Sequence, residues 1–135
     1  MSKRRRRKRL PEPVVTIGVE SLSHDGRGVA HLDGKAVFID GALPGERAGF
    51  EYLATRRSFD EGRATAIHTA SPDRVTPGCP HFGVCGGCSL QHLSPGAQLA
   101  AKQDILLENL ARIGGVAATI VLPPLTGPVM GYRNK

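Results

Sequence analysis

A chain of 135 residues can hold one ordinary domain, or a small domain together with part of a second. No apolar run approaches the roughly 20 residues that span a bilayer, and the N-terminus lacks the apolar stretch of a secretory signal. We therefore expect a cytoplasmic protein that makes no membrane contacts. The 17 glycines and 10 prolines favour short strands and turns over a helix bundle.

The chain opens on a basic tail, residues 1–13. Residues 3–9 supply seven of the eighteen Lys and Arg side chains, and the remainder carries eleven against twelve acidic residues. A block of like charges repels itself, is typical of a disordered segment, and attracts phosphate groups without reading sequence. The tail is therefore predicted to bind RNA, and a solvated tail that only aids solubility is the alternative. The predicted contacts are Arg4, Arg5, Arg6 and Arg7.

Residues 14–70 are predicted to form a small closed barrel of the OB type. Five short runs rich in β-branched residues predict strands, with tight connections and no helix between them. Asp33-Gly34 is a strong hairpin signal, and Pro44-Gly45 suits the centre of a type II turn. The fold class is therefore mainly β. The strands are expected at residues 14–22, 29–32, 35–39, 47–53 and 63–68.

One polar segment of this barrel is the candidate RNA face. OB-type barrels bind single-stranded nucleic acid through basic side chains and exposed aromatic rings. Arg56, Arg57 and Phe59 lie close together in the sequence and are predicted to face RNA. A strand aromatic in so small a barrel is more often a core residue. Phe59 is expected to be the most exposed of the barrel aromatics, because it is predicted to lie in a polar loop beside Ser58 and Asp60. The others are Phe38, Phe50 and Tyr52.

A Cys-rich loop, residues 71–94, contains all three cysteines of the chain within ten residues. Clustered thiols that include a Cys-x-x-Cys pair indicate one metal centre rather than a disulfide framework. A zinc site would need a fourth ligand, which His81 or His92 could supply, whereas an iron–sulfur cluster normally takes four thiolates. Spacing alone does not select the metal. The predicted ligands are Cys79, Cys85 and Cys88.

The last segment, residues 95–135, begins with a predicted helix. Ser94 suits the N-cap, Pro95 the first helical position, and apolar residues recur at helical spacing as far as Ile113. Gly114-Gly115 then ends the helical pattern. The residues that follow are too few to build a domain, so we expect the helix to lead into a domain that this chain lacks.

The order of these features resembles the N-terminal part of the S-adenosylmethionine-dependent RNA (uracil-5-)-methyltransferases. That family combines a TRAM domain, which is an OB-like barrel, with an iron–sulfur region and a Rossmann-like catalytic domain. The resemblance implies that RNA, either rRNA or tRNA, is the partner, and we expect a monomer. The segments that carry the likeness are Asp25–Ala30, Leu43–Glu46, Cys79–His92, Gln98–Lys102 and Gly131–Lys135.

The resemblance also implies a cofactor, and it implies that the catalytic residues lie in another part of the enzyme. Cys79, Cys85 and Cys88 match three ligands of a [4Fe–4S] cluster, whose fourth cysteine lies much further along in the family and is missing here. The family's nucleophilic cysteine, general base and S-adenosylmethionine site also lie downstream. No residue of this chain is therefore predicted to be catalytic, and the chain alone is expected to be inactive. The alternative is a stand-alone RNA-binding module with a Cys3His structural zinc site.

Overall fold

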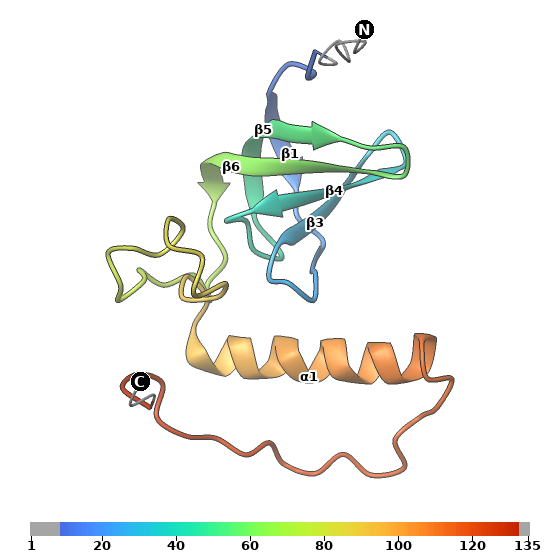
Figure 1. Ribbon diagram of the computed structural model, residues 1–135, viewed down its shortest axis with the longest axis vertical. Coiled ribbons are helices and arrows are strands. Elements are labelled where there is room, and N and C mark those ends of the chain that lie inside the picture. The colour runs from blue at the N-terminus through green and yellow to red at the C-terminus, as the bar shows by residue number, and fades with distance from the viewer. Residues whose placement is uncertain (1–8, 133–135) are drawn as a thin grey trace, which may run out of the picture. The chain divides into compact units, whose positions relative to one another are not determined.

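The computed structural model describes residues 9–132 of the chain (Figure 1). These residues divide into two compact units, with the boundary between Pro72 and Asp73. The strands of the described residues lie in the first unit, and the cysteine loop and the helix lie in the second. The tail arginines predicted to contact RNA lie outside the described residues; they are Arg4, Arg5, Arg6 and Arg7.

The first unit is a single six-stranded sheet with the strand order β1-β5-β6-β4-β3-β2. The β4–β6 pair is parallel, and the other four neighbouring pairs are antiparallel. The expected mainly β, OB-like fold class is confirmed, but the sheet is open, with β1 and β2 at its edges, and not the closed barrel that was predicted. The strands are β1 (Val14–Gly18), β2 (Ser21–Leu22), β3 (Gly28–Leu32), β4 (Lys35–Asp40), β5 (Arg47–Thr55) and β6 (Phe59–Thr69).

The two outer strands of this sheet, β1 and β2, are consecutive in the chain and are separated only by Val19 and Glu20. Val19 N–H donates to the carbonyl of Glu46, next to β5, at 2.9 Å, and Glu20 N–H donates to the carbonyl of Val29 in β3 at 2.8 Å. The strand predicted over residues 14–22 is therefore one bent segment that pairs with β5 and then with β3. This bend brings both edges of the sheet to one corner, as in a partly open OB-like barrel.

The core of the barrel is built mainly from inward-facing residues of β4 and β5. Val37, Ile39, Ala48 and Phe50 are fully buried, because alternate residues of a strand face the same side of the sheet. The Phe50 ring crosses Gly62 of β6, where a β-carbon would approach the Phe50 Cδ2 atom to 2.5 Å. The packing of Phe50, the largest fully buried side chain, therefore depends on a glycine in the neighbouring strand.

Two predicted turns are confirmed by backbone geometry. Asp33 and Gly34 take φ angles of 50° and 77°, which the two-residue hairpin between β3 and β4 requires. Gly45 takes a φ of 82°, and Glu46 N–H donates to the carbonyl of Leu43 at 3.2 Å, which closes a type II turn. The buried carboxylate of Glu46 accepts hydrogen bonds from Leu43 N–H and Ser71 N–H at 2.9 Å and 3.1 Å. This carboxylate fastens the turn to the residues after β6.

The second unit contains one described helix, α1 (Pro95–Arg112), at the predicted position. Ser94 precedes it without forming a side-chain capping bond. At the other end, Gly115 takes a φ of 63°, and Val116 N–H donates to the carbonyl of Leu110 at 3.0 Å, which is a glycine-based helix ending. No residue of α1 is buried, and no helix within residues 9–132 has the length and hydropathy to span a membrane.

Candidate nucleic-acid interface and cysteine loop

The hairpin between β5 and β6 places Arg56, Arg57 and Phe59 together at one end of the barrel. Arg56 N–H donates to the carbonyl of Phe59 at 3.0 Å. Lys35 of β4 fastens this hairpin, because its ammonium lies 2.6 Å from both the Arg56 carbonyl oxygen and the Asp60 carboxylate. The three predicted RNA contacts therefore lie on a hairpin that is tied to the sheet.

The prediction that Phe59 lies in a loop is wrong. β6 begins at Phe59, earlier than the predicted start at Arg63, and Phe59 pairs with Ala36 of β4. Phe59 is half-buried, as is Phe38, whose ring it contacts edge to face with the centroids 5.5 Å apart. The strand was missed because Asp60 and the residue after it are acidic, and acidic residues are uncommon in strands.

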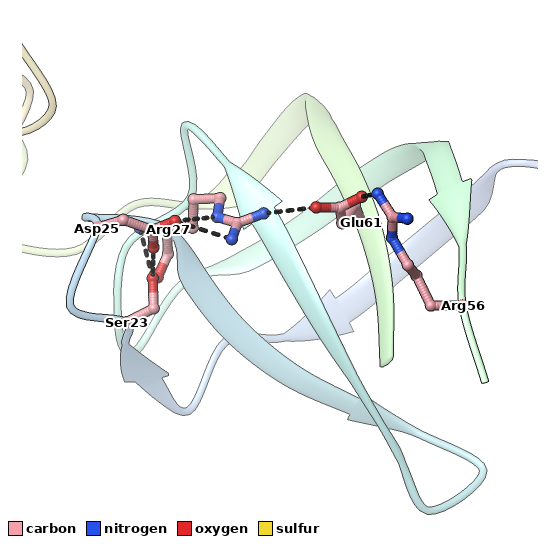
Figure 2. Close-up of polar contacts among 5 residues, drawn as sticks. All are labelled: Ser23, Asp25, Arg27, Arg56 and Glu61. Carbon is pink, nitrogen blue, oxygen red and sulfur yellow. Dashed lines mark hydrogen bonds and ion pairs between the residues drawn. The ribbon is translucent and has the colours of Figure 1, made fainter. Parts of the chain in front are cut away.

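A chain of ion pairs crosses the outer surface of the barrel (Figure 2). Asp25, in the loop before β3, lies 2.8 Å from the Arg27 guanidinium. Arg27 Nη1 lies 3.4 Å from Glu61 Oε1, and Arg56 Nη2 lies 3.1 Å from Glu61 Oε2. Glu61 therefore joins an arginine of the β3 side to an arginine of the β5–β6 hairpin.

Ser23 and Asp25 set the position of Arg27. The Ser23 hydroxyl contacts the Asp25 carboxylate, and Arg27 N–H donates to Ser23 Oγ at 2.9 Å. Burial alone would raise the pKa of Asp25, but hydrogen bonds from Ser23 and Arg27 outweigh it and lower that pKa below its ordinary value. Burial would likewise lower the pKa of Arg27, and Asp25 and Glu61 outweigh it and raise that pKa. Both groups are therefore held in their charged forms.

Both arginines in the chain of ion pairs, Arg27 and Arg56, lie over an aromatic ring. The guanidinium carbon of Arg27 is 5.0 Å from the centroid of Phe38, and that of Arg56 is 5.9 Å from the centroid of Phe59. Both distances are within the range of cation–π attraction. The sequence analysis named Phe38 only among the candidate aromatics and did not predict that Arg27 and Glu61 belong to this surface. The available signal was the alternation in β6, which places Phe59 and Glu61 on the same face.

The barrel as a whole is not a basic surface. Residues 9–72 hold seven Lys and Arg against nine Asp and Glu. Arg56 is paired with Glu61, whereas Arg57 and Arg63 are exposed. Electrostatic attraction to RNA therefore has little support from the barrel, and the predicted roles of Arg56, Arg57 and Phe59 stay predictions.

One glutamine side chain closes the cysteine loop on itself, and a second ties the loop to α1. Cys79 N–H donates to Gln91 Oε1 at 3.1 Å. The Gln98 amide of α1 donates to the carbonyls of Leu90 and Leu93 at 2.9 Å and 2.8 Å. These bonds give a structural reason for two of the segments that carry the family resemblance. They hold the end of the cysteine loop against the first turns of the helix.

The three cysteines suit a metal by type but are not gathered around one point. All three are free thiols; Cys79 is half-buried and Cys85 and Cys88 are exposed. Gly87 N–H donates to Cys85 Sγ at 3.3 Å, the kind of bond that supports a metal-bound thiolate. Within residues 9–132, however, no three His, Cys, Asp or Glu side chains converge as a metal site would require. His92 is buried and packs against the ring of Phe82.

Comparison with known proteins identifies a domain model and several proteins to which the chain is similar. The family model of the TRAM domain matches residues 9–49. The chain is 59% identical over 131 residues to the 23S rRNA (uracil(1939)-C(5))-methyltransferase RlmD of Alcanivorax borkumensis, a match that covers 97% of this chain and 29% of that protein. It is 51% identical over 135 residues to the protein of the same name from Methylococcus capsulatus, covering 100% of this chain and 30% of that protein.

A third relative of the same name, from Acidithiobacillus ferrooxidans, is 54% identical over 125 residues, with 93% of this chain and 28% of that protein covered. The chain therefore spans less than a third of the length of these relatives. The TRAM match begins before β1 and ends inside β5, so it falls on the barrel described above. The chain carries a TRAM domain, and over nearly its whole length it is similar to RNA (uracil-5-)-methyltransferases, the family that its motifs resemble.

Proposed function

We propose that this chain is the RNA-binding part of an S-adenosylmethionine-dependent 23S rRNA (uracil-5-)-methyltransferase. The observation that carries the proposal is the identity of 51–59% over nearly the whole chain to relatives named for that reaction. Ribosomal rather than transfer RNA is the substrate in this proposal, because those names specify 23S rRNA. A monomer in the cytoplasm, where ribosomal RNA is modified, is part of the same proposal.

Two parts of the chain share RNA binding in this proposal. The basic tail, residues 1–13, supplies affinity through phosphate contacts. The acidic residues of the barrel, residues 14–70, outnumber its basic ones, so the barrel adds little electrostatic affinity for RNA. Its role in this proposal is to orient the RNA through Arg56, Arg57 and Phe59. The contact boundary at Pro72 supports a separate barrel domain.

Residues 71–94 form the metal-binding part of the proposal. Cys79, Cys85 and Cys88 hold a [4Fe–4S] cluster together with a fourth ligand from outside this chain. The spacing of the thiols and the N–H bond to Cys85 Sγ support it. A Cys3His zinc site is the alternative, and because the thiols do not converge within residues 9–132, either metal requires the loop to rearrange.

No catalytic step is assigned to these cysteines. The reaction needs a thiolate that adds to C6 of uracil, so that C5 becomes nucleophilic toward the methyl donor. In this proposal that thiolate and the donor site lie in the part of the relatives that this chain does not match. By itself the chain is therefore expected to transfer no methyl group.

A chimera tests the proposed function. This chain replaces the matching segment of the Alcanivorax borkumensis relative, and 5-methyluridine is measured by mass spectrometry of nucleosides from 23S rRNA and tRNA. The expected result is methylation of 23S rRNA alone, whereas the relative with its matching segment deleted gives none. A folded chimera that methylates tRNA, or no RNA at all, would contradict the proposal.

A further inference from the structure

The outer surface of β4 and β6 carries an ordered set of side chains. Val37 and Ile39 of β4 face the core, so Phe38 between them faces outward. Phe38 is the register partner of Glu61 in the parallel β4–β6 ladder. Phe59 lies two residues before Glu61 and therefore shares its face. Two rings and one carboxylate thus lie side by side on the outside of the barrel.

The two arginines on this surface differ in their exposure. Glu61 binds both through separate oxygens, at 3.4 Å for Arg27 and 3.1 Å for Arg56. The Arg27 side chain is 26% exposed and is also held by Asp25, whereas the Arg56 side chain is 57% exposed. Arg27 is therefore enclosed, and Arg56 presents a free surface to solvent.

We propose that the guanidinium of Arg56, held between the Phe59 ring and the Glu61 carboxylate, is a stacking platform for one unpaired RNA base, and that Glu61 is its positioning residue. This inference rests on the proposed function. RNA bases stack on the planes of arginine side chains as well as on aromatic rings. An exposed arginine normally moves among many rotamers, so an ion pair and a ring that fix its plane reduce the ordering needed on binding.

Simple electrostatics predicts the opposite effect of Glu61 on binding. Removing a negative charge from an RNA-binding surface strengthens the attraction for phosphates. If Glu61 positions Arg56, its neutralisation weakens the binding of a base-bearing strand instead. The sign of the change therefore distinguishes a positioning carboxylate from one that only balances charge.

The experiment uses two probes and two pairs of matched variants of the full chain. The probes are a fluorescein-labelled ten-nucleotide oligouridine and a strand of the same length with abasic riboses, which keeps the phosphates and lacks the bases. Arg56→Lys keeps the charge and loses the flat guanidinium. Arg47→Lys is its control, since Arg47 is an exposed residue of β5 and makes no ring contact among the described residues. Glu61→Gln is matched by Glu51→Gln, an exposed residue of β5.

Arg56→Lys and Glu61→Gln are each expected to weaken binding of oligouridine about five- to tenfold, the lower end of the effect of one stacked base. Neither changes binding of the abasic strand by more than about twofold. Arg47→Lys leaves both probes unchanged, and Glu51→Gln leaves binding equal or slightly tighter. Thermal unfolding confirms that each variant is folded. If Glu61→Gln is not folded, the Arg56→Lys and Arg47→Lys pair decides the question.

Three results would overturn the platform. They are equal effects of Arg56→Lys and Arg47→Lys, tighter binding of oligouridine by the Glu61→Gln variant, and losses that the abasic strand shares. Each of these would indicate phosphate contacts alone. A wild-type chain that binds both strands equally would also exclude it while preserving RNA binding. A wild-type chain that binds neither strand would overturn the proposed RNA-binding function, and the platform with it.

Discussion

The ammonium group of Lys35 lies 2.6 Å from the carboxylate of Asp60, and this pair joins the first residue of β4 to the second residue of β6. The Asp60 side chain is 11% exposed, so its charge is largely removed from water. Lys35 also donates to the Arg56 carbonyl. The pair therefore holds the hairpin that carries the candidate RNA contacts.

Lys35→Met is expected to reduce the free energy of unfolding by about 1–3 kcal/mol, because it leaves the Asp60 carboxylate nearly buried without its cation. Urea unfolding followed by circular dichroism measures the change. The double variant Lys35→Met/Asp60→Asn removes both charges and is expected to recover part of the loss. Strictly additive effects of the two substitutions would show that the pair is not coupled.

Gly62→Ala is expected to reduce stability by about 1–3 kcal/mol, the usual effect of overpacking. A β-carbon there would lie 2.5 Å from Phe50 Cδ2 and 3.0 Å from the Glu51 carbonyl oxygen, and backbone cannot easily move away. Gly18→Ala in β1 is the matched control, since no atom lies within 4 Å of its added methyl group. Thermal unfolding of both variants checks this, and equal melting temperatures would contradict the packing argument.

Asp25 should make the barrel more sensitive to acid. Its pKa in the folded state is lowered by Ser23 and Arg27, against the effect of burial. Its contribution to stability is therefore fully present above its ordinary value of 3.8 and is lost as the pH falls through the lowered folded value. Asp25→Asn lacks this contribution at neutral pH, so its stability deficit relative to wild type should shrink as the pH is lowered toward 2.

Urea unfolding at intervals between neutral pH and about pH 2 measures that deficit. Ser23→Ala provides an independent check, because it removes one hydrogen bond to the same carboxylate and is expected to give a smaller change in the same direction. A deficit that stays constant over the whole range would show that Asp25 titrates alike in the folded and unfolded chain.

Deleting residues 2–9 should weaken RNA binding and flatten its salt dependence. Seven of the chain's basic residues lie in this segment, so about five to seven phosphate contacts are lost, and each lowers the slope of log affinity against log salt by about 0.7–0.9. Fluorescence anisotropy across a range of salt concentrations measures the slope. The matched variant Arg56→Ala/Arg57→Ala removes at most two such contacts. An unchanged slope after the deletion would place phosphate binding on the barrel.

Local chemistry explains which features could be read from the sequence. Asp33-Gly34 and Pro44-Gly45 determine their own backbone angles, so both turns were predicted correctly. The start of β6 was missed because the partners that stabilise Asp60 and Glu61 come from other elements of the barrel. The same holds for the Glu61 bridge, which depends on pairing between β4 and β6.

The fold also explains why the metal site is harder to predict than the thiols. Cys79, Cys85 and Cys88 lie close in sequence, but proximity along a loop does not bring three sulfurs to one point, and within residues 9–132 they do not converge. In the proposed site, convergence of the sulfurs depends on the metal and on a fourth ligand. Neither is encoded in the local spacing.

Metal analysis of the purified chain is therefore expected to depend on oxygen. A [4Fe–4S] cluster held by three thiolates keeps one exposed iron, which makes it labile. Chain purified in air should contain substoichiometric iron or adventitious zinc, and anaerobic reconstitution with iron and sulfide should give a brown protein that absorbs near about 400 nm. Iron, zinc and sulfide are assayed on both preparations, with Cys85→Ser as the control that loses the colour.

Two outcomes would change the assignment of the ligands. Full iron occupancy that is stable in air would mean that the chain completes the site itself, for which His81 or His92 is the available donor. Zinc without sulfide in the anaerobic preparation would favour the Cys3His alternative, because neutral imidazole and three thiolates complete a tetrahedral zinc site. His81→Gln and His92→Gln then separate the two donors, since only the ligand's replacement releases the metal.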